Sequence, residues 1–317
     1  MQSCFTLKDR RRDWAWIELK GFCGERAMFW QQIINGISIG GVYALMAVGY
    51  SLVYSVLNFS NFSHGEILMI GSYAGFYALT ALHLSFGLAI GLSVVVGGLA
   101  AMLVEKVGYR PLRLRNAPTL YFMISAMGLS IFLQNFVLVT IGPNFRTYPD
   151  VFNFDPIEMG SVVVGSLDLV IFIISVVSLI LLTWFIYGTK LGVAIQAAAY
   201  NMRTACLMGI NPDLVVSIVF AMAGASAGIG GVMFGMKYTT YPWMGVITIK
   251  AFIAAVVGGL GSLPGAVIGA FLLGITETLA AAFVSSAFRD LFSFALMILI
   301  IIIRPSGLMG VVAKEKA

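Results

Sequence analysis

The feature that most constrains this chain is a set of long stretches without any Asp, Glu, Lys or Arg. The two longest, 27–65 and 67–104, contain 39 and 38 residues. Shorter uncharged stretches cover 116–145, 169–189, 214–236 and 251–276. A helix that crosses about 30 Å of hydrocarbon needs about 20 mostly apolar residues. Each long stretch can therefore hold two membrane-spanning helices, and each shorter one can hold about one.

Composition excludes most other classes of protein. Of the 317 residues, 60% are hydrophobic and 10% are charged, against about 45–50% and about 25% in an average soluble domain. A soluble enzyme, a secreted disulfide scaffold and a disordered chain do not fit these values. The apolar runs also lack the alternation typical of outer-membrane barrel strands. We expect an all-α, polytopic helix bundle in a lipid bilayer, with about eight to nine transmembrane segments and some interrupted helices.

The chain divides into one large membrane domain and two short ends. The hydrophobic segments are expected at about 33–57, 67–83, 86–104, 119–141, 167–187, 212–236, 247–260, 266–285 and 290–303. They form a transmembrane domain over 28–310, followed by a cytoplasmic tail at 311–317. Residues 1–27 carry ten charges and lack the features of a signal peptide. This segment is either a surface arm or not part of the native protein, and we favour translation from Met28, which N-terminal sequencing would test.

Basic residues indicate which loops face the cytoplasm, because Lys and Arg are enriched on that side. Loop 105–116 is basic and is predicted inside, which places 142–166 outside and 188–211 and the C-terminal tail inside. Counting back puts the start of segment 33–57 outside, where Arg10–Arg12 would be unfavourable. Either residues 1–27 are not native, or the chain breaks inside the membrane near 55–66 and the number of crossings changes by one. The net charge of +5 thus reflects orientation, not nucleic-acid binding.

Six pairs of glycines have the four-residue spacing that lets two helices approach closely. They are Gly36/Gly40, Gly71/Gly75, Gly87/Gly91, Gly224/Gly228, Gly231/Gly235 and Gly265/Gly269. Glycines four residues apart lie on one face of a helix and present no side chain there. The pairs predict close packing, either within this chain or against a partner subunit.

The sequence contains no signature of covalent chemistry. A Gly-x-x-x-x-Gly-Lys-[Ser/Thr] phosphate loop, a Gly-x-Ser-x-Gly elbow and a His-Glu-x-x-His helix are all absent. Two histidines and three scattered cysteines offer no metal-ligand spacing. We expect no catalytic residue, no metal and no cofactor, so an intramembrane enzyme is disfavoured.

A polar stretch from Asn58 to Glu66 interrupts two apolar segments. Asn, Ser and Gly favour turns and helix caps, and Ser63 and Glu66 have the spacing of a capping box. A helix that starts at membrane depth directs free N–H groups and its positive dipole end at whatever lies opposite. Transporters use such broken helices to contact polar solutes. The alternative is an ordinary surface turn in which His64 is solvated.

Other polar positions are few. The segment 192–212 predicts a short inner helix that ends at Gly209 and restarts at Asn211-Pro212; it suits a groove of another protein, or else it is a simple re-entry turn. Lys250 is expected to extend to the membrane surface, and Glu277 is a candidate pathway residue because a charge in an apolar helix normally faces protein or water. Segment 247–260 has the length of a half-helix.

At these places the sequence resembles the LivH-type permease of branched-chain amino acid ABC importers. The resemblance covers about 29–310 and rests on motifs that occur in the family's order and spacing. They are Asn35-Gly36 through Gly49-Tyr50, Asn61-Phe-Ser-His-Gly-Glu66, Ser125 through Gln134-Asn135, Leu207-Met-Gly-Ile-Asn211 and Lys250-Ala-Phe through Gly265. It does not include residues 1–27.

The resemblance implies a subunit of the bacterial inner membrane that imports branched-chain or related hydrophobic amino acids. Its partners would be a second, LivM-like permease, two cytoplasmic ATPases and an extracytoplasmic solute-binding protein. ATP binding would move the inner helix and tilt the bundle between outward-open and inward-open states. The alternatives that stay open are a urea or short-amide ABC permease of the same family and a stand-alone secondary transporter or channel.

Two sets of site residues follow from this resemblance and from the polar stretches. The ATPase-coupling helix would contain Ala197, Ala198, Tyr200, Asn201, Arg203, Ala205 and Gly209. Family members often carry an acidic residue where this sequence has Tyr200 or Asn201. The substrate pathway would be lined by Asn61, Ser63, His64, Glu66, Gln134, Asn135 and Glu277.

Overall fold

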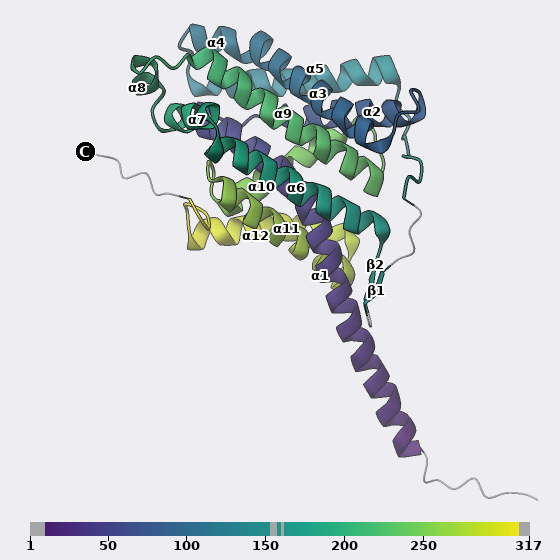
Figure 1. Ribbon diagram of the computed structural model, residues 1–317. Helices are drawn as coiled ribbons and strands as arrows, with labels where there is room; N and C mark the ends of the chain where they lie inside the picture. Colours follow the sequence, from purple (N-terminus) through teal and green to yellow (C-terminus); the bar gives the residue numbers. More distant parts are fainter. Residues whose placement is uncertain (1–9, 153–156, 160–161, 311–317) are drawn as a thin grey trace, which may run out of the picture.

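The protein is a bundle of helices (Figure 1) in the computed structural model, which describes residues 10–152, 157–159 and 162–310. The long helices are α1 (Arg10–Leu57), α3 (Phe86–Val104), α5 (Thr119–Ile141), α6 (Ser166–Gly188), α9 (Pro212–Lys237), α11 (Leu263–Phe283) and α12 (Arg289–Ile303). The other helical elements are α2 (His64–Thr80), π-helical η1 (Glu105–Tyr109), α4 (Arg110–Leu114), α7 (Lys190–Tyr200), α8 (Met202–Leu207), 3-10 helix η2 (Met244–Ile247), α10 (Thr248–Gly258) and 3-10 helix η3 (Ser286–Phe288). A small antiparallel hairpin, β1 (Ile157–Met159) and β2 (Val162–Val164), precedes α6.

Every predicted hydrophobic segment is helical. Within the described residues, seven helical stretches are long and apolar enough to cross a membrane. The other two segments are α2, with 17 residues, and the continuous η2–α10 stretch Met244–Gly258. The prediction of eight to nine segments with interrupted helices is thereby confirmed, and the short ones are the two that flank polar or glycine-rich breaks.

The loops predicted to face the cytoplasm lie at one end of the bundle, and those predicted to lie outside are at the opposite end. At one end, Arg110 and Arg113 bond to Asp213, which joins the 105–116 loop to the start of α9. We call this the inner end; α7 and α8 lie there too (Figure 1). At the opposite, outer end, Arg146 pairs with Thr240 across two loops.

α1 enters the bundle from the outer end. The Gln31 side chain bonds to the backbone of Val163, beside the hairpin. α1 reaches the inner end, where Leu52 and Asn58 lie beside Gln196 of α7, and there the chain turns back: α2 ends at Thr80, and the Phe86 ring that opens α3 contacts Phe152 in the outer loop, 4.7 Å between centroids. α1 therefore crosses inward and α2 leads back outward, and the alternative that the break changes the number of crossings is wrong.

The N-terminal extension continues α1 outward. α1 begins at Arg10, and its first turns project from the outer end of the bundle (Figure 1). The interpretation that translation starts at Met28 stays a prediction. Residues 1–9 and the proposed tail at 311–317 lie outside the described residues.

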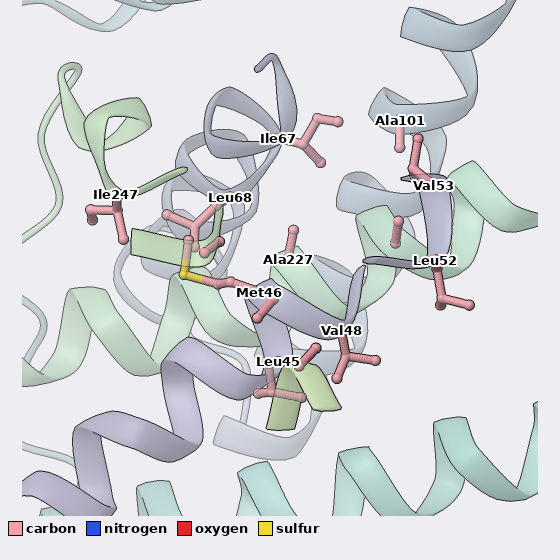
Figure 2. Close-up of a cluster of buried hydrophobic side chains, with 14 of the residues drawn as sticks. Leu45, Met46, Val48, Leu52, Val53, Ile67, Leu68, Ala101, Ala227 and Ile247 are labelled. Atoms are coloured by element: carbon pink, nitrogen blue, oxygen red, sulfur yellow. The ribbon is translucent and has the colours of Figure 1, made fainter. Parts of the chain in front are cut away.

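The core is centred on the inner half of α1 and its neighbours. Figure 2 shows side chains of α1, α2, α3 and α9 meeting there, among them Leu45, Met46, Leu68 and Ala227, each with no exposed surface. Close approach depends on glycine. A Cβ on Gly71 of α2 would lie 2.6 Å from the Cα of Gly228 in α9.

Five of the six predicted glycine pairs pack tightly within the chain. The Ser93 hydroxyl of α3 reinforces one crossing by bonding to the carbonyls of Gly71 (2.7 Å) and Gly228 (2.9 Å), so α2, α3 and α9 meet at one point. For Gly87 and Gly91 the prediction of close packing within this chain is wrong, because no described atom would lie within 4 Å of an added Cβ.

Candidate functional site

The polar interruption between α1 and α2 lies inside the protein. Asn58 leaves α1 with a positive φ of 53°, and α2 begins at His64. Asn61, Ser63, His64 and Glu66 are at most 3% exposed. Because irregular backbone at membrane depth must be covered by protein or face a wet cavity, this is a buried helix break, and the alternative of a solvated surface turn is excluded.

The predicted capping box does not form. Ser63 is the residue before α2, but its backbone is already helical (φ −77°, ψ −3°) and its side chain makes no capping bond. A capping serine needs an extended backbone to aim its oxygen at the first free N–H groups. Instead the Ser63 hydroxyl bonds to the Asn61 side-chain oxygen at 2.7 Å, and the Glu66 carboxylate accepts from Ser130 of α5 at 3.0 Å.

Tyr109 completes this arrangement, and sequence analysis missed it. Its hydroxyl donates to the side-chain oxygen of Asn61 (2.7 Å) and lies 2.9 Å from the Ser63 hydroxyl. The side chain is fully buried although it lies next to the basic inner loop. We refer to Asn61, Ser63, His64, Glu66 and Tyr109 as the helix-break cluster.

Two interrupted helices meet at the helix-break cluster. Gly65 of α2 packs on η2, where its added Cβ would lie 2.9 Å from the Cα of Gly245, and Gly245 itself lies against the Glu66 carboxylate. The sequence predicted both interruptions but not that they touch. Because neither glycine has a side chain, the start of α2 and the start of α10 approach at backbone distance.

Several buried polar atoms around this contact have no hydrogen-bond partner among the described residues. They are Asn61 Nδ2, Glu66 Oε2 and Thr248 Oγ1. More than nine in ten buried polar groups in native proteins are paired with protein or ordered water. The helix-break cluster is therefore a polar site with free donors and acceptors inside an apolar bundle.

Glu277 belongs to a second polar group nearer the outer end. Its carboxylate accepts from Tyr43 (2.8 Å) and Ser293 (2.6 Å) and pairs with Lys250, which also contacts Asp290 at 2.5 Å. We call these five residues the outer ion cluster. The expectation that Lys250 extends to the membrane surface is wrong: a buried carboxylate, 1% exposed, holds the ammonium because each charge would be costly alone.

The side chains of Gln134 and Asn135 form no hydrogen bond with either group among the described residues. Asn135 is exposed, and its amide donates to the carbonyl of Ile131 in the preceding turn of α5. Gln134 is half-buried. The residue by which α5 reaches the helix-break cluster is Ser130, one turn earlier, which the sequence did not single out.

The inner segment forms two short helices, not the single one predicted. α7 ends at Tyr200, and Asn201 adopts an extended backbone and caps α8, accepting from the Thr204 N–H at 3.0 Å. Asn has this preference for caps over helix interiors. The predicted end at Gly209 (φ +85°) and the cap of α9 by Asn211 are present.

This segment, α7–α8, has a packed face and an open one. Ala198 and Ala205 are buried against the bundle, whereas Ala197, Asn201, Arg203 and Gly209 are exposed. Tyr200 is 93% exposed and Leu207 84%. A hollow of about 490 Å³ lies between the two helices, lined by Ala197, Tyr200, Asn201, Thr204, Ala205, Met208 and Ile210. Exposed large apolar groups around a hollow indicate a contact surface for another protein.

The described residues contain no group of three or more His, Cys, Asp or Glu side chains that could hold a metal ion. What the polar clusters offer is hydrogen-bond donors, acceptors and charges inside an apolar bundle. This arrangement suits binding and passage of a polar solute.

Comparison with known proteins supplies the family context. Residues 32–301 match a protein family described as branched-chain amino acid transport system / permease component. The chain is 39% identical to the high-affinity branched-chain amino acid transport system permease protein LivH of Escherichia coli K12, over 91% of this chain and 97% of that protein. It is 38% identical to the corresponding permease protein BraD of Pseudomonas aeruginosa, with 90% and 97% covered.

More distant similarities extend over most of the chain. A probable branched-chain amino acid transport permease protein LivH of Methanocaldococcus jannaschii is 30% identical over 90% of this chain and 94% of that protein. Among solved structures, PsaBC from Streptococcus pneumoniae in complex with Fab is 12% identical, with a TM-score of 0.48 over 85% of this chain and 89% of that chain.

Proposed function

The chain belongs to the family of permease components of branched-chain amino acid transport systems, and from this premise we propose how it works. It is a membrane-spanning permease subunit of an ABC importer in the bacterial inner membrane, and it carries branched-chain amino acids into the cytoplasm. The observation that carries this conclusion is the 39% identity that spans 97% of a LivH permease, because it covers the whole bundle and not one motif.

The chain needs partners to work. Permeases of this kind depend on ATPase and solute-binding proteins, and we assign to this chain two cytoplasmic ATPases, an extracytoplasmic binding protein and a second, LivM-like permease. The chain itself hydrolyses no nucleotide in this proposal. Its support is the absence of a phosphate-binding loop from the sequence.

The mechanism we propose couples the inner surface to the buried clusters. Nucleotide binding draws the ATPases together and displaces α7–α8, which are joined directly to α6 and α9. Because α9 packs on α2 at Gly71 and Gly228, its tilt moves the start of α2 relative to η2. The helix-break cluster would then open alternately to the two ends of the bundle.

Reconstitution tests the function. Vesicles that contain the permeases and ATPases, with binding protein added outside, should take up radiolabelled leucine, isoleucine or valine only when ATP is supplied at the ATPase side. Uptake of urea or acetamide in place of these amino acids would identify the family's alternative substrates. Flux through this chain alone, without ATP, would identify a stand-alone transporter or channel and contradict the proposal.

The first mutational prediction concerns the exposed α7–α8 surface. Leu207→Asp places a charge on an apolar residue that is 84% exposed, so we expect the folded permease to bind its ATPase at least about tenfold more weakly, or about 1.4 kcal/mol. Co-purification of the ATPase with tagged permease measures this. Leu82→Asp is the control, because Leu82 is also exposed but lies in the outer loop before α3. Equal ATPase recovery from both variants would contradict the assignment.

The second mutational prediction concerns the helix-break cluster. Glu66→Gln keeps the shape of the side chain and its contact with Ser130 but removes the charge. We expect ATP-driven leucine uptake to fall about tenfold or more, as for the loss of about 1.4 kcal/mol of interaction with a polar solute, while the assembled complex remains intact. Asp150→Asn makes the same change on an exposed outer loop and should leave uptake unchanged.

Glu277→Gln tests the outer ion cluster in the same assay. Full uptake by both Glu66→Gln and Glu277→Gln would remove the two carboxylates from the pathway.

A further inference from the structure

A polar cavity of about 220 Å³ lies at the outer end of the bundle, apart from the helix-break cluster. α1, α6, α9, α11 and α12 all contribute to its wall, including Ile39, Asp168, Lys237, Tyr238 and Arg289. Drug-sized ligands occupy pockets of about 300–1,000 Å³. A cavity of this smaller size suits a single small solute and not a peptide.

One acidic group in the cavity is only half used. Lys237 Nζ and the Ser38 hydroxyl both bond to Asp168 Oδ1, at 2.5 and 2.8 Å. No hydrogen bond from a described residue reaches Oδ2, and the Asp168 side chain is 25% exposed. A carboxylate oxygen has two lone pairs, so Oδ2 can accept a cationic donor that enters the cavity.

One basic group in the cavity lacks a counterion. Arg289 forms no ion pair with any described residue. It donates a hydrogen bond to the Tyr238 hydroxyl, but its Nε is buried without a hydrogen-bond partner. The nearby acids Glu277 and Asp290 are both paired with Lys250. A partly buried guanidinium is costly unless an anion compensates it, and its planar fork of donors matches a carboxylate.

The cavity therefore offers a cation without a counterion, Arg289, and an unoccupied carboxylate oxygen, Asp168 Oδ2. Both lie beside an apolar wall formed in part by Ile39, which is 2% exposed. A solute that satisfies both carries one carboxylate and one ammonium close together, with an uncharged remainder. We propose that this outer cavity binds a free amino acid, with the α-carboxylate on Arg289 and the α-ammonium on Asp168 Oδ2. The proposal deepens the proposed function and rests on it, because it gives the imported solute its first site within the permease.

Equilibrium binding of radiolabelled leucine to the assembled permease–ATPase complex in nanodiscs, without binding protein, tests the site. Leucine should compete for binding, whereas leucinamide, which lacks the carboxylate, and 4-methylpentanoate, which lacks the ammonium, should compete at least about tenfold less well. Equal competition by leucinamide would overturn the contact with Arg289, and equal competition by 4-methylpentanoate the contact with Asp168.

Variants locate the binding. Arg289→Gln and Asp168→Asn should each weaken leucine binding about tenfold or more, and Arg304→Gln, at the other end of α12, should not. Ala281→Leu narrows the cavity without touching a charge and should weaken binding too, whereas Ala282→Leu, which adds the same side chain at the next position, should not. This pair keeps the test valid if removal of a charge impairs folding.

The outcomes separate the site from the function. Leucine binding that is undetectable in the wild-type complex, or unchanged in Arg289→Gln and Ala281→Leu, overturns the site while ATP-driven leucine uptake leaves the proposed function intact. If the wild-type complex takes up no branched-chain amino acid, the proposed function fails whatever the cavity binds. Binding of a different zwitterion, such as glycine betaine, in preference to leucine would overturn the assignment of the solute.

Discussion

Lys250→Met is expected to destabilise the folded permease by about 3–5 kcal/mol, the cost of removing one partner from a buried ion pair. Glu277 is 1% exposed, and Lys250 is the only cation among the described residues that pairs with it. Without the ammonium, the carboxylate keeps its bonds to Tyr43 and Ser293, but its charge lies uncompensated inside the bundle. Loss of folded protein during titration with a denaturing detergent measures the effect.

A second substitution shows whether the stability lost in Lys250→Met comes from the broken ion pair or from altered packing. In Lys250→Met/Glu277→Gln both charges are absent, so most of the lost stability should return, because a neutral amide costs far less to bury than a carboxylate. Lys106→Met is the control, since Lys106 is exposed and has no ion pair with any described residue. A double variant as unstable as Lys250→Met would show that the ammonium stabilises the fold through something other than Glu277.

Gly228→Leu should destabilise the folded permease about as much as Lys250→Met, but for a steric reason. The Cβ of residue 228 would overlap the backbone of Ser93, and Ser93 fixes α2, α3 and α9 at one crossing through its bonds to Gly71 and Gly228. Overpacking a core costs about 1–3 kcal/mol, and we expect the upper end of that range or more, because backbone cannot move aside as a side chain can. The same detergent titration measures the loss.

Gly91→Leu is the matched control for Gly228→Leu. It puts the same side chain on a glycine of α3 that has no described atom within 4 Å of its added Cβ. We expect stability close to that of the wild type, within about 0.5 kcal/mol, as for a substitution at an uncrowded surface. Because leucine favours the helix more than glycine does, equal loss of stability in both leucine variants would show that close packing at position 228 is not the cause.

Helix positions could be predicted from sequence because the bilayer leaves the chain few choices. A run of about 20 apolar residues has to form a helix to pair its own backbone groups, so segments such as 119–141 and 212–236 are found within a residue or two of the expected bounds. Lys and Arg in short loops likewise fixed the grouping of the loops at two ends. These inferences depend only on local composition.

Side-chain partners could not be predicted, because they depend on how distant helices rotate against one another. Tyr109 is 48 residues from Asn61 along the chain, and its hydroxyl replaces the local capping interaction expected of Ser63. Lys250 and Glu277 are 27 residues apart, and the sequence treated each alone. Rotating a helix about its axis by one residue, about 100°, would replace these side-chain contacts with others.

The burial of α1 has a consequence for how the protein is made. The most apolar stretch of α1 is 94% buried, against 17% for α5 and 11% for the stretch that contains α12. α1 packs chiefly on α11 and α9, which lie in the C-terminal half and are synthesised much later. When α1 leaves the ribosome, Tyr43 lacks its partner Glu277, and the helix must stay in lipid or beside the insertion machinery until the C-terminal half is synthesised. Packing of α1 is thus completed only after the C-terminal helices have been synthesised. A chain truncated after α6 should be inserted into the membrane but left unpacked and open to proteolysis.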